Sequence, residues 1–254
     1  METKAYLIRV MRIHLFQSIV LIAALIMAMT VLCIYVSSCF SVGYNMEIWI
    51  EASESVDFFL SLIVCVVYVP NIYIQHKKNY AKYAAIRCKN KQYVKTQFIA
   101  IAILTCASVF LSYYSALLFC LNLITPGTVM PGSDLQQYVF GSYQVYHPYV
   151  FGAVWCLWKG CVSVLFVIFG GFLAIYTKNL FVSVLSPFLY CMAENLVTAL
   201  LQMPQYSIVT SYVLNRLSPQ SMRAWYYPIG VVTFIVFTSI IVLFVRRRSE
   251  NGYA

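Results

Sequence analysis

Residues 18–36 read SIVLIAALIMAMTVLCIYV, nineteen residues without a charged side chain. At a rise of about 1.5 Å per residue, a helix of this length crosses roughly 30 Å of hydrocarbon. The uncharged stretch extends further, because no Asp, Glu, Lys or Arg occurs between Arg12 and Glu47. This segment therefore predicts a transmembrane helix.

The rest of the 254-residue chain has the same character. Hydrophobic residues make up 62% of it and charged residues only 10%, with a mean hydropathy of +0.79. A typical soluble domain has about a quarter charged residues. No polar stretch is long enough to fold as a second domain, so we expect one all-α integral membrane domain over residues 1–254.

The apolar blocks predict six transmembrane helices. They are expected at about 15–40, 56–74, 98–121, 150–176, 180–201 and 225–245. Pro70 and Pro187 fall within two of them, where neighbouring helices or water can satisfy the freed carbonyl. Tyr6–Phe16 is either a helix lying along the inner membrane surface or the cytoplasmic end of the first span.

The distribution of Lys and Arg predicts the orientation, because these residues are retained on the cytoplasmic side. With both termini inside, 14 of the 17 Lys and Arg residues lie in inner segments, against Arg216 and Arg223 outside and Lys159 within a helix. The net charge of +9 thus follows the membrane topology, and we expect no nucleic-acid partner. The predicted topology is N-in and C-in.

Motifs of enzymes and cofactor sites do not occur in the sequence. It has no GxxxxGK[ST] phosphate loop, no HExxH and no GxSxG. Its nine cysteines lie mostly in apolar segments without metal-ligand spacing, and they are expected to pack as small hydrophobic residues. We therefore expect no catalytic, cofactor or metal site in this chain.

Lys159 and Glu194 are the charged residues expected well inside predicted spans. Charges at depth are costly unless they are paired or hydrated. Both are expected about 12–14 Å from the outer membrane surface, counted along their helices. An ion pair between the fourth and fifth spans is one interpretation, a role in substrate binding or gating is another, and no mutual contact is the third.

The connection after the second span, Gln75–Gln97, reads QHKKNYAKYAAIRCKNKQYVKTQ and has eight cationic or potentially cationic side chains. Positive-inside bias alone could explain this charge. The pattern also predicts a cytoplasmic helix-turn-helix, with Cys88–Lys91 as the turn. Four side chains recur at helical spacing in it: Tyr80, Tyr83, Ala84 and Arg87.

At Tyr83–Tyr93, and on to Lys95, the chain resembles the permease subunits of type-2 ATP-binding-cassette exporters. In that family a run of Tyr or small residues, an Arg-rich turn and a Lys entering the third helix connect spans two and three. The six spans, the short connection at Tyr176–Asn179 and the polar connection at Gln202–Arg223 suit the family as well.

The resemblance implies a subunit that works with partners. Two copies, or two related chains, would form the translocation path, while ATP and Mg²⁺ would bind separate ATPase subunits. Small bacterial permeases of this type commonly export bacteriocins, amphipathic toxin peptides or antibiotics, so the resemblance implies a multi-pass protein of a bacterial cell membrane. The general arrangement is similar to exporters of phenol-soluble-modulin-like peptides. The residues implied to dock the ATPase are Tyr80, Tyr83, Ala84, Arg87, Lys89 and Lys91.

Two other functions stay open. An ATP-independent carrier or channel would use Lys159 and Glu194 as its transport site. A membrane scaffold or immunity protein would bind a toxin without moving it. The direction of transport follows from the resemblance alone.

Overall fold

The computed structural model describes the backbone of residues 2–40, 42–77, 90–124, 134–177 and 179–251. Five residues of the expected docking element (Tyr80, Tyr83, Ala84, Arg87 and Lys89) lie outside these ranges, and Lys91 is described by its backbone alone. The expected helix-turn-helix therefore stays a prediction.

The described residues are almost entirely helical. The α-helices are α1 Glu2–Cys39, α2 Asn45–Asp57, α3 Leu60–Lys77, α5 Asn90–Leu123, α6 Gly141–Tyr146, α7 Pro148–Thr177, α8 Leu180–Leu200, α9 Ile208–Tyr212 and α10 Tyr226–Asn251, and two 3-10 helices are η1 Asp134–Gln137 and η2 Pro204–Tyr206. This composition confirms the all-α class for the described chain.

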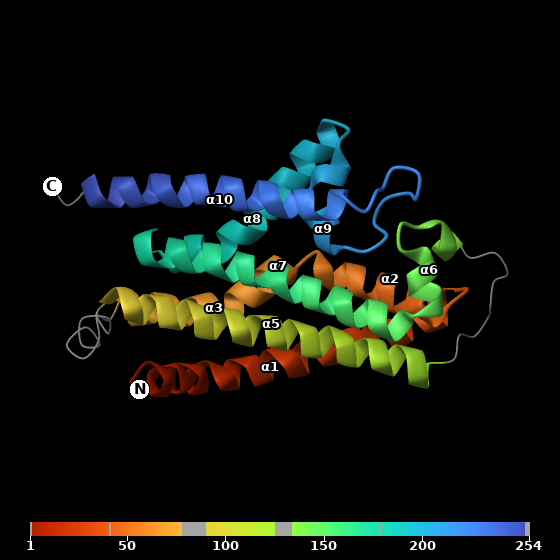
Figure 1. Cartoon of the computed structure of the whole chain (residues 1–254), viewed down its shortest axis with the longest axis horizontal. Coiled ribbons are helices and arrows are strands. Elements are labelled where there is room, and N and C mark those ends of the chain that lie inside the picture. The colour runs from red at the N-terminus through yellow and green to blue at the C-terminus, as the bar shows by residue number, and fades with distance from the viewer. Residues whose placement is uncertain (1, 41, 78–89, 125–133, 178, 252–254) are drawn as a thin grey trace.

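The long helices lie side by side in an elongated bundle (Figure 1). The start of α1, the end of α3, the start of α5 and the end of α10 lie at one end of the bundle, and α6 lies at the other. Five helices are long and apolar enough to cross a membrane, or six if α2 and α3 form one bent span. A multi-pass membrane protein is thus confirmed, and the expected count of six requires the bent pair to be one span.

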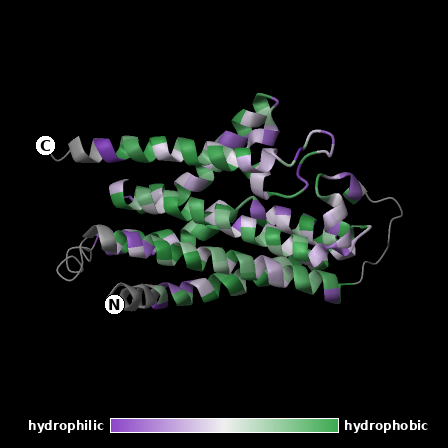
Figure 2. Ribbon diagram, viewed as in Figure 1, coloured by the Kyte–Doolittle hydropathy of each residue, from purple (hydrophilic) through white to green (hydrophobic). Residues whose placement is uncertain are grey.

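Helix α7 is the centre of the bundle. It packs against α3, α5, α8 and α10, and 56% of its most apolar window is buried, against 17% for α8 and for α10. Close approach to α5 requires Gly160, where a Cβ atom would lie 2.9 Å from the carbonyl oxygen of Cys106. Green, apolar residues run along the middle of the bundle in Figure 2. The outer faces of α8 and α10 remain open to lipid or to another protein.

Helices α2 and α3 form a sharply bent pair. Helices α2 and α3 meet at 53°, at Phe58 and Phe59, whereas Pro70 lies within α3. The amide of Phe59 donates to the carbonyl of Val56, a tightened 3-10 turn that redirects the chain without proline or glycine. The break places Asp57 at the junction of the two half-helices.

Helix α1 runs without interruption from Glu2 to Cys39. The segment Tyr6–Phe16 therefore continues the first span, and of the two interpretations offered for it the structure favours this one.

After α8 the chain folds back onto the bundle. Gln202 takes a left-handed backbone conformation with φ of 59°, and η2 and α9 return the chain toward α7 and α10. A Cβ atom at Gly230 of α10 would lie 2.2 Å from the Ser211 Oγ, so only glycine lets α10 approach α9 this closely. We call residues 201–212 the fold-back segment.

Candidate functional site

A buried ion pair joins the bend between α2 and α3 to the central helix α7. The Nζ of Lys159 on α7 lies 2.5 Å from the Oδ2 of Asp57, and both side chains have an exposed fraction of 0%. Lys159 also donates to the Ser53 Oγ at 3.2 Å. Because each charge is neutralised by the other, the pair can exist at depth in the bundle.

Aromatic groups complete the first layer around the ion pair. The Tyr113 hydroxyl on α5 donates to the Asp57 Oδ1 at 2.7 Å. The ammonium of Lys159 lies 4.5 Å from the centroid of the Tyr113 ring and 5.2 Å from that of Trp49. The indole of Trp49 in turn donates to the carbonyl of Tyr113 at 3.2 Å. Helices α2, α5 and α7 are thus locked together at one point, which we call the charged centre.

Asp57 lies between the ends of two helix dipoles, at the bend between α2 and α3. It is the last residue of α2 and lies three residues before the start of α3. The positive N-terminal end of the α3 dipole favours a carboxylate there, whereas the C-terminal end of α2 opposes it. Lys159 supplies the full positive charge that the site requires.

Of the interpretations offered for Lys159 and Glu194, the ion pair between them is not formed, and the absence of mutual contact agrees with the structure. Lys159 pairs with Asp57, and Glu194 on α8 is satisfied by neutral donors. The Ser207 hydroxyl donates to the Glu194 Oε2 at 2.8 Å, and the amide of Ile208 lies 3.2 Å from both carboxylate oxygens. Sequence reasoning had no reason to expect the fold-back segment, which brings these donors to α8.

Sequence analysis missed Asp57, although a signal was present. The acids Glu47, Glu51 and Glu54 share one face of α2, and Glu51 and Glu54 are exposed. Asp57 instead follows the buried Ser53 at a spacing of four, on the apolar face. Spacing alone does not separate Asp57 from Glu54, because residues three apart are neighbours on a helix; the signal was the apolar character of the residues around Ser53 and Asp57.

The fold-back segment packs beside the charged centre. The indole of Trp158, next to Lys159, donates to the carbonyl of Ser211 at 2.8 Å, and the ring of Tyr212 contacts Phe166 edge-on at 5.8 Å. The Tyr212 hydroxyl is buried without a hydrogen-bond partner. Helix α9 thus contacts α7 at Trp158, just before Lys159 in the sequence, and at Phe166, two helical turns after it.

Arg216 ties the fold-back segment to α8. Its guanidinium donates to the Thr210 Oγ1 at 3.1 Å and to the Asn195 Oδ1 at 2.9 Å. Burial lowers the pKa of this guanidinium from its ordinary value, while Tyr212 and nearby acids raise it. The group stays protonated, because an arginine pKa lies far above neutral pH.

A second polar region lies between α1, α3 and α5, and it is uncharged. The Tyr68 hydroxyl lies 2.8 Å from the Ser18 Oγ and 3.0 Å from the Ser108 Oγ, while the Asn71 amide donates to the Gln17 Oε1 at 2.7 Å. Such interhelical hydrogen bonds hold spans together. Across the described residues, no three His, Cys, Asp or Glu side chains come together as a metal site.

Comparison of the chain with protein-family models, with curated proteins and with solved structures finds no significant match. Functional argument therefore depends on the residues themselves. The geometry offers a neutralised charged centre at a helix break, a fold-back segment beside it, and an acidic exposed face on α2.

Proposed function

We propose that this chain is the membrane-spanning permease subunit of an exporter, that two copies form the path, and that separate ATPase subunits supply the energy. The cargo class is an amphipathic peptide or a lipophilic molecule. The observation that carries the proposal is the basic segment Gln75–Gln97, which joins the bundle through α3 and α5 at the end where both chain termini lie (Figure 1). With N-in orientation, this end faces the cytoplasm and an ATPase.

The exposed face of α2 supports a polar path beside the bundle. Glu51 and Glu54 are exposed there, about 6 and 10 Å along the helix from Glu47. Ionised carboxylates facing hydrocarbon are costly, so this face needs water or a protein partner. Arg216 lies within electrostatic range of Glu54, which extends the polar surface toward the fold-back segment.

Apolar surface next to this face supports a second copy. Phe59 stacks on Phe188 of α8 with ring centroids 5.8 Å apart, and Phe59 is 46% exposed. Leu189 and Leu196 on α8 are 53% and 61% exposed. A path between two copies would then be lined by the second and fifth spans, with acids on α2 and apolar rings at the bend between α2 and α3 and on α8.

The charged centre gives this path a mechanical role in the proposal. Because Asp57 is fixed to Lys159 on α7 and to Tyr113 on α5, the α2 half-helix moves with the centre of the bundle. The hinge at Phe58 and Phe59 then lets α3, which leads to the docking segment, tilt against it. ATP binding at the cytoplasmic end would thereby change the position of α3 relative to α2 and so the shape of the outer half of the path.

The first test is purification of the full chain from its native host in mild detergent, followed by identification of bound proteins and an ATPase assay. A stoichiometric ATP-binding partner that is lost in a Tyr83→Ala, Arg87→Glu double variant is the expected result. An Arg223→Glu variant, at the opposite end of the bundle, is the matched control and retains the partner. Recovery of the chain in a pure state, without a nucleotide-binding protein, would overturn the proposal.

A second candidate is an ATP-independent carrier, and the fully buried pair of Lys159 and Asp57 favours it. Reconstituted liposomes distinguish the two functions. A carrier moves substrate without ATP and loses this flux in an Asp57→Asn, Lys159→Met variant, whereas the exporter permease alone moves none. Binding of a toxin peptide without flux in either preparation would indicate the scaffold or immunity function.

A further inference from the structure

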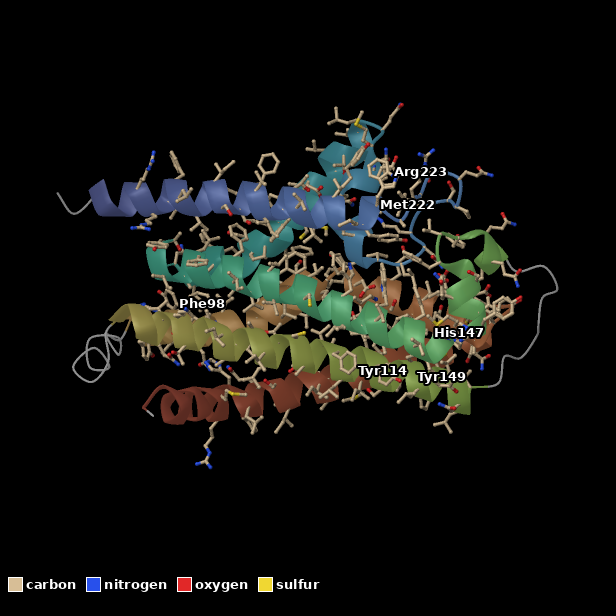
Figure 3. All side chains as sticks on the ribbon, in the orientation of Figure 1. Phe98, Tyr114, His147, Tyr149, Met222 and Arg223 are labelled. Atoms are coloured by element: carbon tan, nitrogen blue, oxygen red, sulfur yellow. The ribbon has the colours of Figure 1, made fainter. Side chains whose placement is uncertain are left out.

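A groove of about 570 Å³ lies between α5 and α7, toward the end of the bundle that contains both chain termini. Phe98 and Phe172 line it from opposite helices, with stacked rings 4.9 Å apart, and Figure 3 shows Phe98 between the two ribbons. From Tyr176 to Ile168 the groove follows α7 for eight residues, about 12 Å. Its length and apolar lining suit part of an acyl chain.

A second apolar groove adjoins the first. It has a volume of about 380 Å³ and lies between α7 and α10, where Phe234, Thr238 and Leu243 line it. Ile168 and Phe172 line both grooves, so these two side chains form a ridge between them. Two adjoining apolar grooves, one on each side of this ridge, provide a place for each of the two chains of a phospholipid.

Lys95 lies at the mouth of the first groove. It is exposed, and it follows the start of the apolar span at Tyr93 by two residues, at the level where lysines reach the headgroup region. The acids with described side chains lie on α2 and α8, and none of them pairs with Lys95. Tyr176 lines the same mouth from the last turn of α7. Among the described side chains Lys95 thus has no acidic partner, which leaves its ammonium open to an anion from outside the chain.

We propose that this surface is a binding site for one anionic phospholipid. The phosphate contacts the Lys95 ammonium beside the Tyr176 hydroxyl, one acyl chain lies in the α5–α7 groove, and the other lies across the ridge against α10. Basic pockets between transmembrane helices bind anionic headgroups by this combination of charge and apolar burial. The site is independent of the transport function and requires only that the helices lie in a bilayer.

The test is native mass spectrometry of the purified full-length protein with phosphatidylglycerol and phosphatidylcholine of identical acyl chains. Wild type is expected to retain phosphatidylglycerol preferentially, and Lys95→Gln to reduce that retention about fivefold, as one cation contributes at an anionic lipid surface. Retention of phosphatidylcholine is expected to stay unchanged. Ile99→Trp, which fills the groove from an exposed position, is expected to lower retention of both lipids.

Lys77→Gln is the matched control, because Lys77 lies at the same end of the bundle on α3, 5.4 Å over the ring of Tyr73, and does not line either groove. Equal loss of phosphatidylglycerol in Lys77→Gln and Lys95→Gln would show general charge attraction and overturn the site. Displacement of the lipid by glycerol 3-phosphate alone would assign the surface to free phosphates instead. Thermal midpoints of the variants establish that each protein is folded.

Discussion

Asp57 and Glu194 are two carboxylates in the same helical bundle, and they are stabilised in opposite ways. Asp57 is fully buried and faces the ammonium of Lys159, whereas Glu194 is partly buried and accepts hydrogen bonds from Ser207 and Ile208. A buried pair depends on both charges, because removing one leaves the other without compensation. Removing a carboxylate that is held by neutral donors loses only those hydrogen bonds. The charged centre should therefore be far more sensitive to mutation.

The largest expected effect is at Lys159. Lys159→Met leaves Asp57 buried without an opposite charge, and we expect a loss of about 3–5 kcal/mol in stability. The thermal midpoint of the protein in detergent, read by size-exclusion chromatography after heating, measures this loss. Adding Asp57→Asn to Lys159→Met should restore most of it. A single variant as stable as wild type would show that the pair is not formed in the membrane.

Tyr113→Phe tests the hydrogen bond from the aromatic layer around the ion pair to Asp57. It removes the hydroxyl that donates to the Asp57 Oδ1 and keeps the ring beside Lys159. We expect a loss of about 2 kcal/mol, the usual range for a hydrogen bond to a charged group. Tyr114→Phe, on the adjacent and partly exposed residue, is the control in the same thermal assay. Equal effects of the two substitutions would contradict the special role of Tyr113.

Glu194→Ala should cost less than either change at the charged centre, about 1–2 kcal/mol, because it removes hydrogen bonds from neutral donors and leaves no opposite charge uncompensated. The effect should also be local. Hydrogen exchange of the α9 amides should accelerate while that of α7 stays unchanged, since Glu194 holds the start of α9. Glu51→Ala, on the exposed face of α2, is the control without this effect. Exchange that accelerates across the whole bundle would place Glu194 in the core instead.

The same comparison explains what the sequence could predict. The apolar blocks predicted the all-α class and the approximate positions of the long helices, because bilayer thickness fixes the length of an apolar segment. The break at Phe58 and Phe59 was not predicted, since the residues there are neither proline nor glycine. The structure alone revealed it as a tightened turn between two helical segments.

The residues of the charged centre were likewise predicted only in part. Lys159 was found because a lone charge in an apolar segment is conspicuous, and its burial agrees with that interpretation. Its partner was not found, because Asp57 follows three other acids and falls at the very start of the expected span 56–74, where a charge is not conspicuous. Pairing across helices depends on three-dimensional neighbours, and α2, not α8, presents its acid to Lys159.

The smallest expected effect is at Ser207, the residue whose hydroxyl donates to Glu194. Ser207 accepts from the amide of Val209 as the N-cap of α9 and donates to Glu194. Ser207→Ala should cost about 1 kcal/mol, and Ser207→Asn should restore part of it, because Asn also caps helices well. If Ser207 and Glu194 act as one unit, the Ser207→Ala, Glu194→Ala double variant should cost less than the two single losses combined. Strict additivity in the thermal assay would instead mean that Glu194 holds α9 through the amide of Ile208 alone, and that the serine acts only as the cap.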